Sequence, residues 1–127
     1  MMHKIIFLDA VDSTNSYLLE HDEPEGTVCA SLNQTAGRGR SSRQWIVQPG
    51  DSLAFSMHLK EIPANKLMGA QIVAGYAVVE SILPWLGARL KWPNDLVYQG
   101  KKLAGLLIET RFIGSTIKKA VFGVGIN

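Results

Sequence analysis

The sequence predicts one α+β domain in which helices cover a mixed sheet. Between residues 53 and 59, large apolar residues alternate with small or polar ones, the period of a β-strand with two different faces. Residues 64–83 instead read as one helix that Pro84 ends. A chain of 127 residues that is 46% hydrophobic is expected to form a single core and to bury roughly two-thirds of its unfolded surface.

Composition narrows the class of protein. The net charge of +2 is small for a protein that wraps nucleic acid, and Cys29 is the single cysteine, so no internal disulfide can form. The longest apolar run, residues 67–79, is shorter than the roughly 20 residues of a membrane span. Residues 1–9 are too short for a signal peptide. We therefore expect a cytoplasmic protein with neither a membrane nor a nucleic acid as partner.

The N-terminal third predicts a strand, a helix and a second strand. Residues 4–8 form a short apolar run, and residues 27–33 form the second strand. Between them, four capping residues at 12–15 stand ahead of the apolar residues 17–19, which marks a helix start that ends at the turn formed by residues 21–26. One residue is enough for the cap. The other three either present hydroxyls and an amide to a ligand or form a redundant cap.

The most unusual stretch is the segment of residues 34–45, here called the arginine loop. It contains three arginines and two glycines, and no acidic residue occurs between positions 26 and 50. Glycine lets the backbone turn sharply, and arginine offers forked donors to carboxylate or phosphate oxygens. The segment therefore predicts a flexible clamp over an anion, the alternative being a solvated basic loop that aids solubility.

The middle of the chain is expected to contribute mainly to the hydrophobic core and not to a catalytic or binding site. The small residues on the second face of strand 53–59 leave room for a ligand, although exposure to solvent explains them nearly as well. His58 stands alone near the end of this strand and is interpreted as a surface histidine. The helix of residues 64–83 has so little polar surface that we expect it to be buried against the sheet.

The C-terminal third predicts a turn and two long strands. Pro93 holds Trp92 extended and an Asn-Asp turn follows, where a phosphate and Mg²⁺ could bind or a plain turn could form. A buried strand covers residues 102–109, and a hairpin turn at 113–115 leads into a last strand at 117–127. The glycines at alternate positions of that strand indicate that something lies against the backbone. The candidates are a flat ligand or a closely packed helix.

Five segments in this order resemble the catalytic domain of biotin protein ligases, and the resemblance covers nearly the whole chain. They are Asp-Ser-Thr-Asn at 12–15, Gln-Thr-Ala-Gly-Arg-Gly-Arg at 34–40 followed by Trp45, Lys-Trp-Pro-Asn-Asp at 91–95, Lys-Leu-Ala-Gly at 102–105, and Gly-Val-Gly-Ile-Asn at 123–127. Sister families that handle lipoate or octanoate are less similar in the second and third segments. The resemblance implies a mixed, largely antiparallel sheet covered by helices, similar to the fold shared by class II aminoacyl-tRNA synthetases and biotin ligases.

The resemblance also implies a two-step, ATP-dependent and Mg²⁺-dependent ligase reaction. Biotin would first be activated to biotinyl-5'-AMP, with release of pyrophosphate. The acyl group would then pass to a lysine of a biotin carboxyl carrier domain, a protein modification. Two alternatives are a truncated, inactive relative that only binds biotin or biotinyl-AMP, and a nucleic-acid binder acting through the arginine loop.

The residues that match the family motifs divide into two sets. Those implied to bind biotin are Ser13, Thr14, Asn15, Gln34, Gly37, Arg38, Arg40, Lys102, Gly105 and Gly123. Those implied to serve ATP are Arg43, Trp45, Lys91, Asn94, Asp95 and Asn127, of which Asn127 would also serve the metal. Lys102 and Arg40 are the implied catalytic residues. Because Lys102 and Gly105 would point to opposite faces of an ideal strand, either a bulge intervenes or Gly105 acts through its backbone.

Two departures from the family pattern stand out. Ser41 and Ser42 replace an arginine and a glycine of the usual Gly-Arg-Gly-Arg-Arg-Gly-Arg loop, which lowers its charge and stiffens its second half. The chain is also short, so we expect residues 1–127 to be only the N-terminal portion of the catalytic domain, without a DNA-binding domain or a C-terminal barrel. Apolar surface left uncovered would then favour a homo-oligomer. We also expect residues 1–127 alone to make biotinyl-5'-AMP poorly or not at all.

Overall fold

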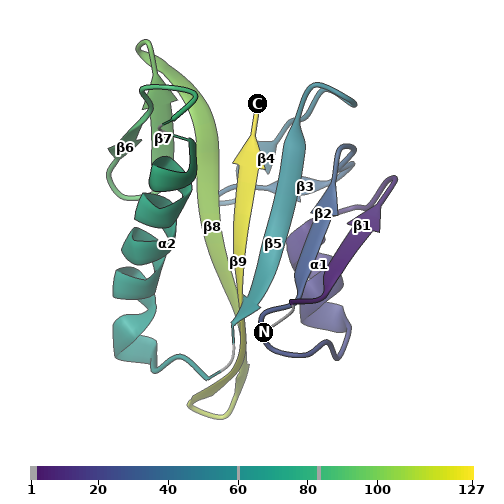
Figure 1. Ribbon diagram of the computed structural model, residues 1–127. Helices are drawn as coiled ribbons and strands as arrows, with labels where there is room; N and C mark the ends of the chain where they lie inside the picture. Colours follow the sequence, from purple (N-terminus) through teal and green to yellow (C-terminus); the bar gives the residue numbers. More distant parts are fainter. Residues whose placement is uncertain (1–2, 60, 83) are drawn as a thin grey trace.

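The computed structural model describes residues 3–59, 61–82 and 84–127. Within them, seven strands form one sheet in the order β1-β2-β5-β9-β8-β7-β6 (Figure 1). The strands are β1 (Ile5–Leu8), β2 (Val28–Ser31), β5 (Leu53–Leu59), β6 (Arg89–Lys91), β7 (Asp95–Tyr98), β8 (Lys101–Ile113) and β9 (Thr116–Ile126). β1 pairs with β2 in parallel, and the other neighbouring strands described in this sheet pair antiparallel, which confirms a mixed, largely antiparallel sheet.

Two helices lie on opposite faces of this sheet (Figure 1). Helix α1 spans Thr14–Glu20, and helix α2 spans Leu67–Ile82 after the short 3-10 turn η1 (Ala64–Lys66). The two faces can be read from adjacent residues of β9, because successive side chains of a strand point in opposite directions. Val121 packs with Leu18 of α1, whereas Phe122 packs with Val79 of α2.

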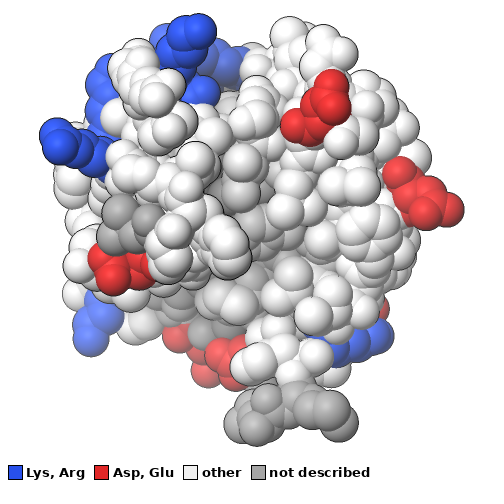
Figure 2. Space-filling model, turned by 45° about the horizontal axis from the view of Figure 1, so that its top comes forward, with Lys and Arg blue, Asp and Glu red and all other residues white. Residues whose placement is uncertain are grey.

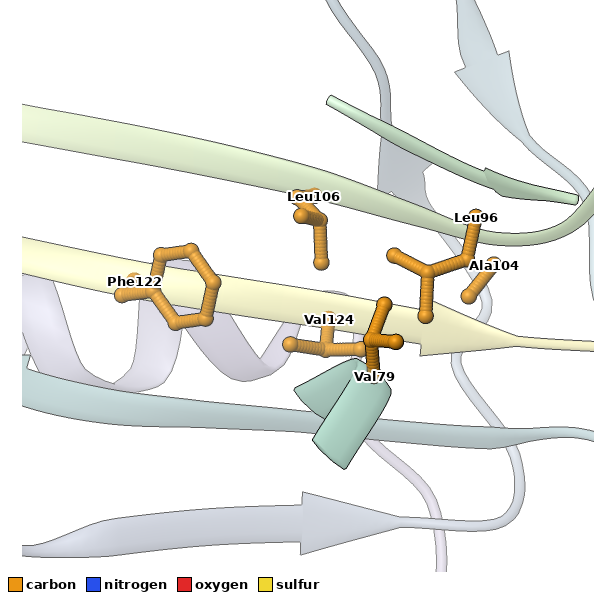
Figure 3. Packing of buried hydrophobic residues seen from close by; sticks show 6 residues of the cluster. All are labelled: Val79, Leu96, Ala104, Leu106, Phe122 and Val124. Atoms are coloured by element: carbon orange, nitrogen blue, oxygen red, sulfur yellow. The ribbon is translucent and has the colours of Figure 1, made fainter. Parts of the chain in front are cut away.

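The larger part of the core lies under α2. Figure 3 shows its buried side chains converging from β7, β8, β9 and the helix: Val79, Leu96, Ala104, Leu106, Phe122 and Val124. Gly75 lets the helix approach closely, since a Cβ atom there would lie 2.7 Å from Leu106 Cδ1. The β8–β9 hairpin therefore forms the centre of the fold.

The expectation that α2 is buried is wrong for much of its surface. Gly75 and Val79 are its buried residues, while Met68, Val73 and Tyr76 are each more than half exposed. The helix contacts the sheet along one stripe only, and its remaining apolar residues face away from it. Leu83, the predicted last residue of the helix, lies outside the described residues. Within those residues, neither helix is long and apolar enough to cross a membrane.

On the second face of β5, two interpretations are wrong: exposure to solvent as the reason for the small residues, and His58 as a surface histidine. Solvent does not explain the small residues, because Ser52, Ala54, Ser56 and His58 are all buried. His58 is not a surface histidine, since its Nδ1 lies 2.9 Å from the carbonyl oxygen of Glu23. The segment between α1 and β2 folds back over this end of the strand, a long-range contact that a period of two does not report.

Candidate functional site

The N-terminus of α1 organises the site. Ser13 caps the helix, with its side-chain oxygen accepting from the Ser16 N–H at 3.3 Å. The next two side chains, Thr14 and Asn15, are buried over the sheet. The backbone N–H of Thr14 donates to Gln34 Oε1 at 2.9 Å, so the first residue of the arginine loop is bound to the helix terminus. The predicted helix start is therefore confirmed, and its extra polar residues do more than repeat the cap.

A chain of hydrogen bonds continues from Thr14 into the sheet. Ser56 Oγ donates to Asn15 Oδ1 and lies 2.7 Å from Thr14 Oγ1. Each hydroxyl carries one hydrogen, so the Thr14 hydroxyl donates to Ser56, and its 3.3 Å approach to Gln34 is secondary. Ser56 is fully buried, and the sequence predicts its place on the small face of β5 but not this role.

Glycines form the floor beneath these side chains. Strand register places Gly123 between Ser56 and Leu107, and Gly125 beside Gly105. A Cβ atom at position 123 would lie 2.9 Å from Asn15 Cγ, and one at position 105 would lie 2.8 Å from Trp45 Cζ3. Something does lie against these strands, as the sequence predicts. Within the described residues it is Asn15 and the indole of Trp45.

The arginine loop is a small hairpin whose two strands are β3 (Gly37–Arg38) and β4 (Gln44–Trp45). Ser41 and Ser42, the departures from the family pattern, both adopt positive φ angles of 56° and 61°. This is the left-handed region that glycine occupies more readily, so the hairpin tip keeps a shape that serine adopts only with strain.

Arg38 is held by a carboxylate. Its Nε and Nη2 donate to Glu109 Oε1 and Oε2 at 3.0 and 2.9 Å, and its Nη1 donates to Ser16 Oγ at 2.8 Å. The hydrogen bond to Glu109 raises the pKa of Arg38 above its already high ordinary value. Glu109 was not identified from the sequence. The available signal was a lone acid directly after the apolar run of residues 103–108.

These groups enclose a small cavity of about 50 Å³. Its lining includes nine of the predicted site residues: Ser13, Thr14, Asn15, Gln34, Arg38, Trp45, Asn94, Gly105 and Gly123. The cavity adjoins a second, wider pocket, and the residues that line both are Gln34, Arg38, Gly39, Trp45, Leu107 and Glu109. Gly37, Arg40 and Arg43 line this wider pocket, which the arginine loop forms together with Leu107 and Glu109 of β8.

Lys102 lies beside this cavity on the Trp45 side. The register of β7 and β8 shifts between Leu96 and Val97, so that Lys102 pairs with Val97 while Gly105 pairs with Asp95. A bulge therefore brings Lys102 and Gly105 to one face, the first of the two predicted solutions. Lys102 Nζ lies 2.9 Å from Asp95 Oδ1 and 5.2 Å from the centre of the Trp45 ring.

The remaining residues predicted to serve ATP do not lie together in one cluster. Asn94 is buried and donates to the Leu106 carbonyl at 3.1 Å, which fixes the start of β7 against β8. Lys91 is exposed on the neighbouring strand. Asn127 Oδ1 accepts from Ser52 Oγ at 3.0 Å.

The described residues do not fit a resident Mg²⁺ site. No group of three or more His, Cys, Asp or Glu side chains comes together among them. Asp95 is neutralised by Lys102, and the amide oxygen of Asn127 already accepts a hydrogen bond. Mg²⁺ in proteins is usually held by one or two carboxylates together with substrate phosphates, and neither Asp95 nor the side chain of Asn127 offers an unpaired carboxylate here.

The charges around the site are uneven. Figure 2 shows Lys and Arg side chains gathered toward the upper left of the face it presents, whose centre carries few charges. Arg40 and Arg43 form no ion pair with another residue in the described ranges, unlike Arg38. Two guanidinium groups of the loop are therefore available to an anion.

The chain is similar to known proteins along almost its whole length. The family model described as "Biotin/lipoate A/B protein ligase family" matches residues 7–127. The bifunctional ligase/repressor BirA of Escherichia coli is 40% identical over 130 residues, which cover 97% of this chain and 40% of that protein. The corresponding protein of Bacillus subtilis is 36% identical over 133 residues, covering 100% of this chain and 41% of its own length.

Solved structures give the same result. A biotin protein ligase from Aquifex aeolicus in complex with biotin and ATP has a TM-score of 0.84 and 37% identity, over 98% of this chain and 52% of that chain. The chain thus spans about half the length of the proteins it matches or less. Since the family model matches almost the whole chain, the protein belongs to the biotin/lipoate A/B protein ligase family.

Proposed function

We propose that this chain carries the biotin-activating site of a biotin protein ligase. The observation that carries the proposal is the polar network that links Gln34, Thr14, Ser56 and Asn15 above Gly123. The ureido ring of biotin has a carbonyl acceptor and two N–H donors. Hydroxyl and amide groups supply both kinds of partner from one surface. We assign Ser13, Thr14 and Gln34 to this ring, with Asn15 and the backbone of Gly37, Gly105 and Gly123 shaping its pocket.

The proposed first step joins two anions. A biotin carboxylate oxygen attacks the α-phosphorus of ATP, the bond to the bridging oxygen of pyrophosphate breaks, and biotinyl-5'-AMP forms. Cations fixed near the reacting atoms lower this barrier by stabilising the developing charge. Arg40 and Arg43 are suited to the phosphates because neither forms an ion pair with another described residue. Lys102 is suited to the reacting carbonyl, and Asp95 orients its ammonium at 2.9 Å.

The nucleotide would lie on the Trp45 side of the site. The indole Nε1–H of Trp45 is buried and has no hydrogen-bond partner among the described residues. A buried donor left unpaired costs about 1–3 kcal/mol, which favours an acceptor atom of the ligand at this place. Lys91, Asn94 and Asn127 stay predictions for the same side.

The second step passes the acyl group to a protein. The neutral amine of a lysine on a biotin carboxyl carrier domain attacks the acyl carbonyl, AMP leaves, and the amine loses a proton. We place the reaction in the cytoplasm, where a single buried thiol such as Cys29 stays reduced. The exposed apolar side chains of α2 support the expectation of self-association.

Pyrophosphate exchange tests the proposal. Incubated with biotin, ATP and labelled pyrophosphate, and supplied with the C-terminal half of a biotin ligase catalytic domain, fused or in trans, the chain should incorporate label into ATP only when biotin is present. Biotin binding without exchange would favour the alternative of a binding module. Salt-dependent binding of DNA or RNA in place of biotin would favour the nucleic-acid alternative.

A further inference from the structure

We propose that Glu109 is a positioning residue of this site, which fixes both the arginine loop and the amide of Asn15. The inference rests on the proposed function for its consequence on biotin, but its geometry stands independently. Glu109 lies on β8 opposite Val121, on the face of the sheet that α1 covers. One carboxylate there joins a loop, a helix terminus and a strand.

Both oxygens of Glu109 are used. Oε1 accepts from Arg38 Nε, and Oε2 accepts from Arg38 Nη2 and also from Asn15 Nδ2 at 2.8 Å. Two parallel bonds between a guanidinium and a carboxylate fix orientation as well as distance. Because Gln34 is bound to Thr14 and Arg38 to Glu109, the loop is held at two points four residues apart.

This arrangement gives Arg38 a different role from the other arginines of the loop. Its charge is already paired with Glu109 and its third bond goes to Ser16, so it acts as a tether. An incoming carboxylate would have to displace Glu109 to use it. The anion therefore falls to Arg40 and Arg43, beyond the tether, where the loop is free to close.

Glu109 also determines which way the Asn15 amide points. A carboxylate only accepts, so the NH₂ of Asn15 must face Glu109 and the carbonyl oxygen must face Ser56. A glutamine at position 109 offers both a donor and an acceptor and removes this constraint. The pattern of donors and acceptors next to Gly123 would then no longer be fixed.

The ion pair contributes little to global stability. The side chains of Arg38 and Glu109 are 41% and 25% exposed, and partly exposed pairs typically contribute about 1 kcal/mol or less. Loss of Glu109 should therefore release the loop without unfolding the domain. This separates a positioning role from a purely structural one.

Limited trypsin digestion of the whole chain tests the inference without any ligand. In Glu109→Gln, cleavage after Arg40 and Arg43 should accelerate about fivefold, a change of about 1 kcal/mol in the opening of the loop. Glu80→Gln, which removes the same charge from the exposed surface of α2, should digest like the parent. Arg38→Ala should accelerate cleavage as much as Glu109→Gln, and the double variant no more than either.

Biotin titration by calorimetry supplies the second arm. Glu109→Gln should raise the Kd for biotin about tenfold while Glu80→Gln leaves it unchanged. Three results would each overturn the inference. They are a parent-like cleavage rate in Glu109→Gln, additive acceleration in the double variant, and a melting temperature of Glu109→Gln low enough for global unfolding to explain the cleavage. An unchanged Kd of Glu109→Gln for biotin would also overturn the inference, but it would not affect the proposed function. Failure of the parent chain to bind biotin, with the cleavage pattern as expected, would instead refute the proposed function alone.

Discussion

The side chain of Asn15 lies directly on the backbone of Gly123, leaving no room for a Cβ atom between them. A methyl group at position 123 would meet Asn15 Cγ at 2.9 Å and the amide oxygen at a shorter distance still. The contact joins the helix terminus to the central strand of the sheet. It explains why the last strand carries a glycine at a place where glycine weakens a strand.

Gly123→Ala should therefore disturb the site more than the fold. We expect it to displace Asn15, to lower the free energy of unfolding by about 1–3 kcal/mol through overpacking, and to abolish measurable biotin binding. Gly87→Ala is the matched control, because a Cβ atom there meets nothing within 4 Å. Urea unfolding and calorimetry measure the two effects. Parent-like biotin affinity in Gly123→Ala would contradict the placement of the ligand above this strand.

Gln34→Ala should weaken biotin without slowing the chemistry of bound substrate. The substitution leaves the Thr14 N–H without its partner and removes a proposed ureido contact, a loss of about 1–3 kcal/mol for a buried polar group. Gln48→Ala, the same change at an exposed position, should behave like the parent. Biotin titration and pyrophosphate exchange at saturating biotin separate affinity from rate.

Lys102→Ala should show the opposite profile. If Lys102 stabilises charge that appears only in the transition state, adenylate formation slows far more than biotin binding weakens. Lys101→Ala changes the adjacent exposed lysine and should leave both quantities unchanged. Single-turnover formation of biotinyl-5'-AMP, assayed in a chain long enough to be active, is the measurement. Identical profiles for Lys102→Ala and Gln34→Ala would contradict the division of roles.

Cys29 should make stability depend on pH in the alkaline range. Burial, with a smaller effect from Glu23, raises the pKa of its thiol from 9.0 to about 11. The folded state thus binds this proton more tightly than the unfolded state. The contribution is complete below pH 9 and is lost as the pH rises through about 11. Urea unfolding across this range should show a steeper decline than in Cys29→Ala, and equal slopes would contradict the assignment.

The pattern of the sequence was sufficient for most elements of the fold. The period of two located β5, the cluster of capping residues located the start of α1, and the turn at Gly114 located the β8–β9 hairpin. Periodicity could not tell which surface of α2 faces the sheet, because the helix has little polar surface to orient it. Periodicity also could not predict that His58 is buried, because the segment that covers it, around Glu23, is far away in the sequence.

The sequence was sufficient to predict most residues of the site, but not the hydrogen bonds and ion pairs that join them. Motif order identified the polar terminus of α1, the arginine loop and the glycine strand, which the fold brings together around one cavity. The roles of Ser56 and Glu109 could not be predicted from the sequence, because they depend on the register of β5, β9 and β8, which places both residues beside Asn15. The bulge that turns Lys102 toward Gly105 was left open for the same reason. The flexibility of the arginine loop as a clamp over an anion stays a prediction.

Titration of biotin into the folded chain by isothermal calorimetry tests the central claim most directly. The account predicts saturable binding of one biotin per chain, lost in Gly123→Ala and retained in Gly87→Ala, with circular dichroism showing that all three proteins are folded. A folded parent chain that gives no saturable heat with biotin would contradict the claim. So would a Gly123→Ala variant that binds biotin as tightly as the parent.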